Sequence, residues 1–176
     1  MSGSFEKKIP PGEDRERLVC KDCGFVAYEN PKVVVGAVAT AGDRILICKR
    51  ALEPRTGYWT LPAGFLELNE SAWDGAAREA WEEARARIEP VQLLATYSIP
   101  RISQVQLFYL ARLVDEAVSA GPESLEVKLA TWDEIPWNDL AFPSVRWALH
   151  HYRAVKEKAV FAPFSNPPGE TGDMTR

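Results

Sequence analysis

The pattern of hydrophobic positions between residues 33 and 132 predicts a β-sheet. Residues 33–40 form a run rich in β-branched side chains, which is typical of a buried strand. The small and polar residues at 41–43 then predict a hairpin turn, and residues 44–50 supply its partner strand. Further strands are expected at residues 59–61, 91–98, 103–114 and 125–132.

Two segments have the periodicity of amphipathic helices. Residues 71–86 contain no proline, their apolar side chains recur three and four residues apart, and Ser71 stands where an N-cap is needed. Residues 145–158 form the second expected helix. Strands interleaved with two helices predict an α/β (α+β) sandwich around a mixed β-sheet.

The ends of the chain lack such patterns. Residues 1–17 are polar and contain two prolines and a glycine in succession, which predicts a flexible N-terminal segment. Residues 161–176 hold three prolines and two glycines without an apolar period, which predicts a flexible tail. A short cysteine-containing segment at 18–32 and a domain at 33–160 remain as the folded parts.

Composition narrows the class of protein. Of the 176 residues, 46% are hydrophobic and 26% are charged, which excludes a wholly disordered chain. The net charge of −4 argues against nucleic acid as a partner. The longest apolar run, residues 33–42, has about half of the ~20 residues that a membrane span needs, and no secretory signal is recognisable. We therefore expect a cytoplasmic protein that binds neither nucleic acid nor membrane.

Three carboxylates gather on one side of the first expected helix. Glu79, Glu82 and Glu83 are three and four residues apart, and like charges at this spacing cost about 0.2–0.5 kcal/mol per pair on an open helix. They form either a solvated face or a site for a cation, because hard divalent ions such as Mg²⁺ prefer carboxylate and carbonyl oxygens. For a bare helix the solvated face would be favoured.

The residues around this helix favour the cation. Five residues separate a glycine from a glutamate, seven more lead to an Arg-Glu pair, and two further glutamates follow. This spacing resembles the signature of the Nudix hydrolases, a strand-loop-helix unit that binds divalent metal and cleaves nucleoside diphosphates linked to another group. The resemblance implies a Nudix-type α/β/α sandwich that uses Mg²⁺ or Mn²⁺. The matching positions are Gly64, Glu70, Arg78, Glu79, Glu82 and Glu83.

One position departs from the signature in a way that bears on the helix end. Arg85 stands where the family has a glycine, which normally ends the helix in a left-handed conformation. A residue with a Cβ atom adopts that conformation at a cost of about 1 kcal/mol. We therefore expect the helix to run to Arg85 or beyond it.

The resemblance also implies roles for individual residues. The implied metal ligands are Glu79, Glu82, Glu83 and the carbonyl of Ala63. Arg78 would orient a neighbouring glutamate, and Gly64 and Glu70 would support the unit. The general base is either one of the helix glutamates or a glutamate from a distant loop, for which Glu123 and Glu126 are candidates. The alternative for these two is that they are surface acids.

Outside this signature, residues 30–36, 49–51, 57–65 and 121–124 extend the resemblance over roughly residues 18–152. In these segments the chain looks like one Nudix subgroup, whose plant and bacterial members are described as FAD and ADP-ribose pyrophosphatases. This implies a small-molecule nucleotide diphosphate substrate that is cut to AMP and a second monophosphate. The alternatives are an NADH or other nucleotide pyrophosphatase of the same family and a non-catalytic Nudix-like nucleotide-binding sensor. A sensor would be free to lose Arg78 or a carboxylate, and because none is missing we expect an enzyme.

Substrate binding needs cations for the phosphates and an aromatic face for the base. Arg50 and Arg101 are favoured, because an arginine beside a loop is free to form a bidentate phosphate clamp. Tyr97 is a weaker candidate, since an aromatic residue in a strand is more often part of the core. The full set of candidates is Arg50, Arg55, Tyr97, Arg101 and Gln104.

Cys20 and Cys23 look like one knuckle of a zinc ribbon. A structural zinc ion needs four ligands, and the second cysteine pair of the subgroup is absent here. Cys48 lies in an apolar strand and fits a core residue, and an odd number of cysteines argues against a disulfide framework. We expect a ribbon remnant without Zn²⁺, and a homodimer in which two chains share one zinc ion is the alternative.

Overall fold

The computed structural model describes residues 4–173, and the chain divides into two units between Pro31 and Lys32. The first unit is a three-stranded sheet of β1 (Phe5–Lys8), β2 (Arg17–Cys20) and β3 (Val26–Ala27). The strand β1 lies where we expected a flexible segment. It forms because the turn at Gly12, whose φ is 84°, brings residues 5–8 back against β2 in antiparallel pairing.

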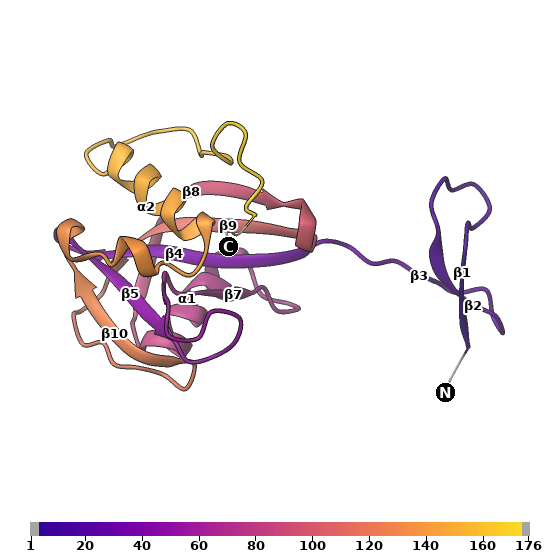
Figure 1. The fold of residues 1–176 in the computed structure, drawn as a ribbon, viewed down its shortest axis with the longest axis horizontal. Coiled ribbons are helices and arrows are strands. Elements are labelled where there is room, and N and C mark those ends of the chain that lie inside the picture. Colours follow the sequence, from indigo (N-terminus) through magenta and orange to yellow (C-terminus); the bar gives the residue numbers. More distant parts are fainter. Residues whose placement is uncertain (1–3, 174–176) are drawn as a thin grey trace. The chain divides into compact units, whose positions relative to one another are not determined.

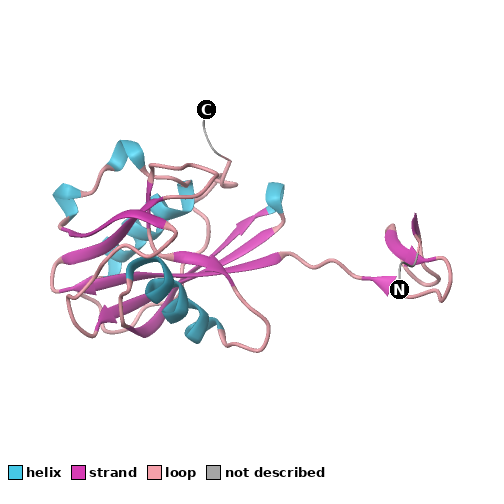
Figure 2. Cartoon of the chain, turned by 90° about the horizontal axis from the view of Figure 1, so that it is seen from below, coloured by secondary structure: helices cyan, strands magenta, loops and turns pink. Residues whose placement is uncertain are grey.

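The second unit is built on a seven-stranded mixed sheet (Figures 1 and 2). Its main path has the order β10-β5-β4-β9-β8, with β6 paired to β5 and β7 paired to β4. The strands β4 and β9 run parallel, whereas the other pairs are antiparallel. The strands are β4 (Lys32–Ala41), β5 (Arg44–Arg50), β6 (Trp59–Thr60), β7 (Ala63–Phe65), β8 (Ile88–Ile99), β9 (Gln104–Leu113) and β10 (Ser124–Ala130).

Two helices, α1 (Ala72–Ala84) and α2 (Pro143–Val155), pack on opposite faces of this sheet (Figure 1). Successive side chains of β5 alternate between the faces, so that Ile45 and Ile47 pack with α2 while Leu46 packs with α1. The expected α/β/α sandwich is therefore confirmed. Single 3-10 turns cover residues Pro100–Ile102 (η1), Trp132–Glu134 (η2) and Trp137–Asp139 (η3).

The helix α1 begins as expected and ends earlier than expected. At its start, the Ser71 hydroxyl accepts a hydrogen bond of 3.1 Å from the Asp74 amide. At its end, Arg85 has a φ of 50° and is already in the left-handed region, so the expectation of a longer helix is wrong. The last carbonyls of the helix find their hydrogen-bond donors outside it, because the amides of Ser119 and Gly121 donate to the carbonyls of Ala84 and Glu83, respectively, at 2.9 Å.

The C-terminal segment also differs from the expected flexible tail. Phe164 forms a parallel bridge to Ala95, and its amide and carbonyl bond to the backbone of β8 at 2.9 Å. The strand β8 lies at the edge of the sheet, so the segment supplies partners that an edge strand otherwise lacks. Within residues 4–173, no helix is long and apolar enough to cross a membrane.

Candidate active site

A cleft of about 670 Å³ opens where β7 and the start of β4 meet α1. The strand β7 pairs with β4 through Gly64 opposite Val35, and the chain then loops back into α1. The resemblance to the Nudix signature therefore corresponds to a strand-loop-helix unit at one side of this cleft. The cleft is lined by Ala63, Gly64, Arg78, Glu79, Glu82 and Glu83.

Gly64 is needed because a carboxylate lies directly over it. A Cβ atom at this position would be 2.4 Å from both carboxylate oxygens of Glu79. Only glycine therefore lets the α1 carboxylate approach the β7 backbone this closely. Glu70 shapes the connecting loop, since its Oε1 accepts a hydrogen bond of 2.7 Å from the amide of Glu67.

Arg78 joins the loop to the helix carboxylates. Its guanidinium makes a bidentate pair with Glu70, with Nε to Oε2 at 3.0 Å and Nη2 to Oε1 at 2.8 Å. Its Nη1 donates to Glu79 Oε1 and to Glu82 Oε2, both at 2.8 Å. The pKa of Glu70 is lowered, chiefly by its hydrogen bonds from Arg78. Arg78 thus fixes the orientation of three carboxylates at once.

Glu83 is a cleft carboxylate with a buried oxygen that lacks a hydrogen-bond partner within residues 4–173. Its side chain is buried, and its Oε2 atom has no hydrogen-bond partner among the described residues. Burial, followed by the charge of Glu79, raises the pKa of Glu83 to about 8. Burial also raises the pKa of Glu79, against the hydrogen bond from Arg78. A buried acceptor without a donor is costly, and a cation would satisfy it.

The carboxylates suit a divalent cation but are not arranged as a finished metal site. Within residues 4–173, no three His, Cys, Asp or Glu side chains are grouped closely enough to hold a metal ion. Glu79 and Glu82 both point to Arg78, whereas Glu83 keeps a free oxygen. The donor set is all oxygen, which fits Mg²⁺ or Mn²⁺. A cation would share these carboxylates with Arg78, which bonds one oxygen of Glu79 and one of Glu82.

Four of the other expected residues reach the same cleft, namely Arg50, Arg101, Gln104 and Glu123. Arg50 is held by a hydrogen bond of 2.9 Å from Nε to the carbonyl of Pro54, and its guanidinium lies 5.1 Å from the ring centre of Phe142. Arg50 and Glu83 line the same cleft, and the charge of Arg50 opposes the rise in the pKa of Glu83.

Of the residues expected to bind the substrate or to act as general base, Tyr97, Arg55 and Glu126 do not line the cleft. Tyr97 is fully buried in the core, where its hydroxyl lies 2.7 Å from Nδ1 of His151, because its side chain leaves β8 on the α2 face. Arg55 lies over the Tyr58 ring at 5.0 Å. Glu126 is exposed and pairs with Lys49 at 3.7 Å, which corresponds to the surface-acid alternative.

The cleft also contains residues that the sequence did not single out. Gln106 follows Gln104 by two positions on β9 and so shares its face, a signal that the period of two could have supplied. The contribution of Gly172 had no such signal, because it depends on the path of the C-terminal segment. The additional lining residues include Ile99, Gln106, Phe108, Phe142, Ser144 and Gly172.

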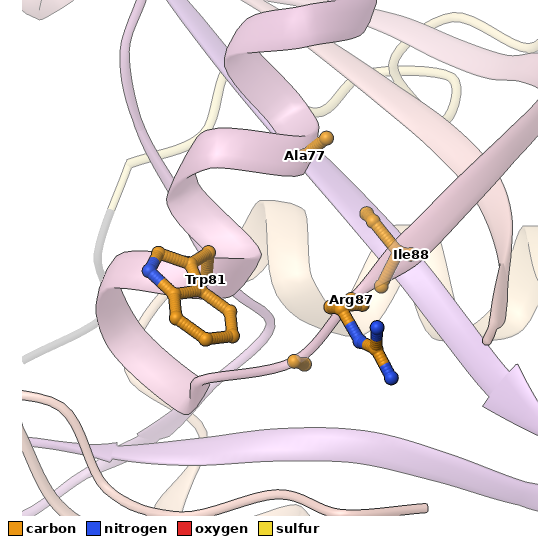
Figure 3. A pocket seen from close by; sticks show the side chains of 5 residues that line it. Ala77, Trp81, Arg87 and Ile88 are labelled. Atoms are coloured by element: carbon orange, nitrogen blue, oxygen red, sulfur yellow. The ribbon is translucent and has the colours of Figure 1, made fainter. Parts of the chain in front are cut away.

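Two further features lie outside this cleft. Cys20 is buried and Cys23 exposed in the first unit, and both have free thiols. A shallower pocket lies beside the end of α1, between the exposed ring of Trp81 and the side chains of Arg87 and Ile88 (Figure 3). It is largely apolar and contains none of the expected site residues, so it has no evident role in the chemistry.

Comparison with known proteins agrees with the geometry. Residues 30–157 match the NUDIX domain, and residues 2–29 match the family described as Nudix N-terminal. A MutT-like protein of Streptomyces ambofaciens is 34% identical over 102 residues, which are 58% of this chain and 64% of that protein. An ADP-ribose pyrophosphatase of Methanocaldococcus jannaschii is 26% identical over 75% of this chain and 76% of its own.

Solved structures agree as well. A NUDIX hydrolase from Nitrosomonas europaea is 43% identical, covers 93% of this chain and 94% of its own, and superposes with a TM-score of 0.87. The matched NUDIX domain covers more than half of the chain and includes the cleft and the carboxylates of α1. The chain therefore belongs to the Nudix hydrolase family.

Proposed function

We propose that this Nudix hydrolase cuts the pyrophosphate bond of a nucleoside diphosphate linked to another group, with ADP-ribose and FAD as the first candidates. The observation that carries the proposal is the buried, unpartnered Oε2 of Glu83 beside Glu79 in a cleft that arginines also line. Carboxylates can hold a divalent metal ion and arginines can bind phosphate oxygens, so together they suit a metal-bound diphosphate. The Methanocaldococcus relative, which is named an ADP-ribose pyrophosphatase, supports this choice of substrate.

The proposed metal ligands are Glu79, Glu82, Glu83 and the carbonyl of Ala63. When bound, Mg²⁺ or Mn²⁺ would screen the diphosphate charge and lower the pKa of a bound water. Both oxygens of Glu70 hold the guanidinium of Arg78 in place. Arg78 would therefore fix the orientation of any carboxylate that is not bound to the metal. Mutual repulsion of the glutamates would then not open the site.

Arg50 and Arg101 are the proposed phosphate contacts, since both line the cleft and guanidinium groups bind phosphate oxygens in bidentate fashion. Glu123 is the proposed general base, because it lines the cleft whereas Glu126 does not. It would take a proton from the attacking water as the new P–O bond forms. The bridging P–O bond then breaks, and ADP-ribose gives AMP and ribose 5-phosphate.

A substrate panel with Mg²⁺ and with Mn²⁺ tests the proposal. We expect ADP-ribose or FAD to be cut faster than NADH and nucleoside triphosphates. Glu83→Gln should lower turnover by about a hundredfold or more, because it removes a charged metal ligand. Glu89→Gln is the matched control, since Glu89 is an exposed acid on β8 that does not line the cleft. Turnover of triphosphates alone, or normal turnover in folded Glu83→Gln, would contradict the proposal.

A further inference from the structure

The segment after α2, which includes residues 164–173, is hydrogen-bonded to the edge strand β8 (Figure 1, in yellow). The amide of Phe164 donates to the carbonyl of Leu94, and its carbonyl accepts from the amide of Thr96, both at 2.9 Å. The Phe164 ring also stacks on His151 of α2, with ring centres 4.1 Å apart and planes 5° from parallel. The segment is therefore held to both the sheet and the helix that covers it.

A second anchor fixes the register of the segment. The side-chain amide of Asn166 makes two hydrogen bonds of 2.8 Å with the backbone of Ser98, one accepted from its amide and one donated to its carbonyl. Asn166 also donates to the carbonyl of Glu170 at 3.0 Å, which turns the segment back toward the end of β8. Local side-chain bonds of this kind define a path for the chain without regular secondary structure.

This path ends at the cleft. Gly172 lines the cleft against Ile99, with a φ of 78°, and a Cβ atom there would lie 2.4 Å from Cδ1 of Ile99. The next residue, Asp173, accepts a hydrogen bond of 3.0 Å from Nε of Arg101 and one of 2.6 Å from Thr171. Arg101 is one of the two proposed phosphate contacts, so the segment touches the substrate-binding machinery directly.

We infer that the C-terminal segment borders the substrate cleft at Gly172 and that Asp173, which pairs with the cleft residue Arg101, is a specificity-determining residue. It favours substrates whose group beyond the diphosphate is uncharged and carries hydroxyls, such as a sugar, over nucleoside triphosphates. The inference rests on the proposed function, because it concerns the same cleft.

The chemistry of the pair supports this direction of selectivity. Asp173 engages Nε of Arg101, so the two terminal nitrogens of the guanidinium stay available, among the described contacts, for one phosphate. A carboxylate accepts hydrogen bonds from sugar hydroxyls, whereas it repels an additional phosphate at the same place. Selectivity thus comes both from hydrogen bonds between Asp173 and sugar hydroxyls and from repulsion between Asp173 and an additional phosphate.

The test compares hydrolysis of ADP-ribose and ATP, with Mg²⁺, by four forms of the full chain. They are the wild type, Asp173→Asn, the conservative Asp173→Glu and the control Glu170→Gln. Glu170 is an exposed acid of the same segment that has no described contact with Arg101, and its replacement by Gln makes the same change in net charge. The measured quantity is the ratio of kcat/KM for ADP-ribose to kcat/KM for ATP, with kcat and KM determined separately.

We expect Asp173→Asn to lower this ratio by about threefold or more, mainly through KM, because charge effects between exposed groups are of this size. Asp173→Glu should keep most of the wild-type ratio, and Glu170→Gln should leave it unchanged. An unchanged ratio in Asp173→Asn, or an equal change in Glu170→Gln, would overturn the inference.

Binding of the same two nucleotides without metal, measured by calorimetry, separates this inference from the proposed function. A wild type that binds but does not hydrolyse would refute the proposed function, and the ratio of affinities would still test Asp173. Hydrolysis with no effect of Asp173→Asn would refute the inference alone. A wild type that neither binds the two nucleotides without metal nor hydrolyses them with Mg²⁺ would overturn both.

Discussion

The end of α1 makes an unusual stability prediction, namely that a glycine should stabilise the protein. Arg85 has φ and ψ of 50° and 23°, and the left-handed conformation costs a residue with a Cβ atom about 1–2 kcal/mol. Arg85→Gly removes this cost but loses the cation–π contact with Trp81 at 5.6 Å, worth about 0.5 kcal/mol at an exposed site. Greater freedom of glycine in the unfolded chain offsets a further part. We therefore expect a net gain of about 0.5 kcal/mol in the free energy of unfolding.

Two control variants isolate the backbone contribution. Arg85→Ala loses the contact with Trp81 but keeps the left-handed cost, so Arg85→Gly should exceed it by about 1 kcal/mol. Ala77→Gly lies inside the helix at a partly buried position and should destabilise the protein by about 1 kcal/mol. Urea denaturation followed by tryptophan fluorescence measures all three. If Arg85→Gly is less stable than Arg85→Ala, the backbone argument is wrong.

Two further predictions concern the cleft. Because burial raises the pKa of Glu83 above its unfolded value of 4.5 to about 8, its contribution to stability is complete below pH 4.5 and is lost as the pH rises toward 8. In EDTA the free energy of unfolding of the wild type should therefore fall by on the order of 3 kcal/mol between pH 5 and pH 8, and that of Glu83→Gln should fall clearly less. Urea denaturation at the two pH values measures both, and an equal fall in the two proteins would contradict this prediction. Gly64→Ala should fold but turn over substrate about a hundredfold more slowly, because its Cβ atom displaces the Glu79 carboxylate. If the kinetics of Gly64→Ala equal those of the wild type, the close contact between Gly64 and Glu79 has no importance for turnover.

The sequence was sufficient for the sandwich and for most of the carboxylate cluster. Alternation in β5 and the helical period of α1 are local signals, and they predict which side chains face the core. The spacing from Gly64 to Glu83 is also local, so it predicts a unit whose parts contact one another directly.

Features that depend on distant segments were not predictable in this way. The helix α1 ends at Ala84 because a loop 35 or more residues later supplies amides to its last carbonyls, and no pattern within the helix reveals this. Likewise, Phe164 and Asn166 order the C-terminal segment through the backbone of β8, although the segment itself is rich in proline and glycine. Tyr97 lies in the core and not in the cleft, because the face on which a strand residue emerges depends on the register of the sheet.

The most direct test of the central claim is identification of the products formed from ADP-ribose. With Mg²⁺ or Mn²⁺ present, we expect equal amounts of AMP and ribose 5-phosphate from the wild type, and neither product in EDTA or from Glu83→Gln at comparable protein concentration. Release of inorganic phosphate, or equal product formation by Glu83→Gln and the Glu89→Gln control, would contradict a metal-dependent cut inside the diphosphate at this cleft.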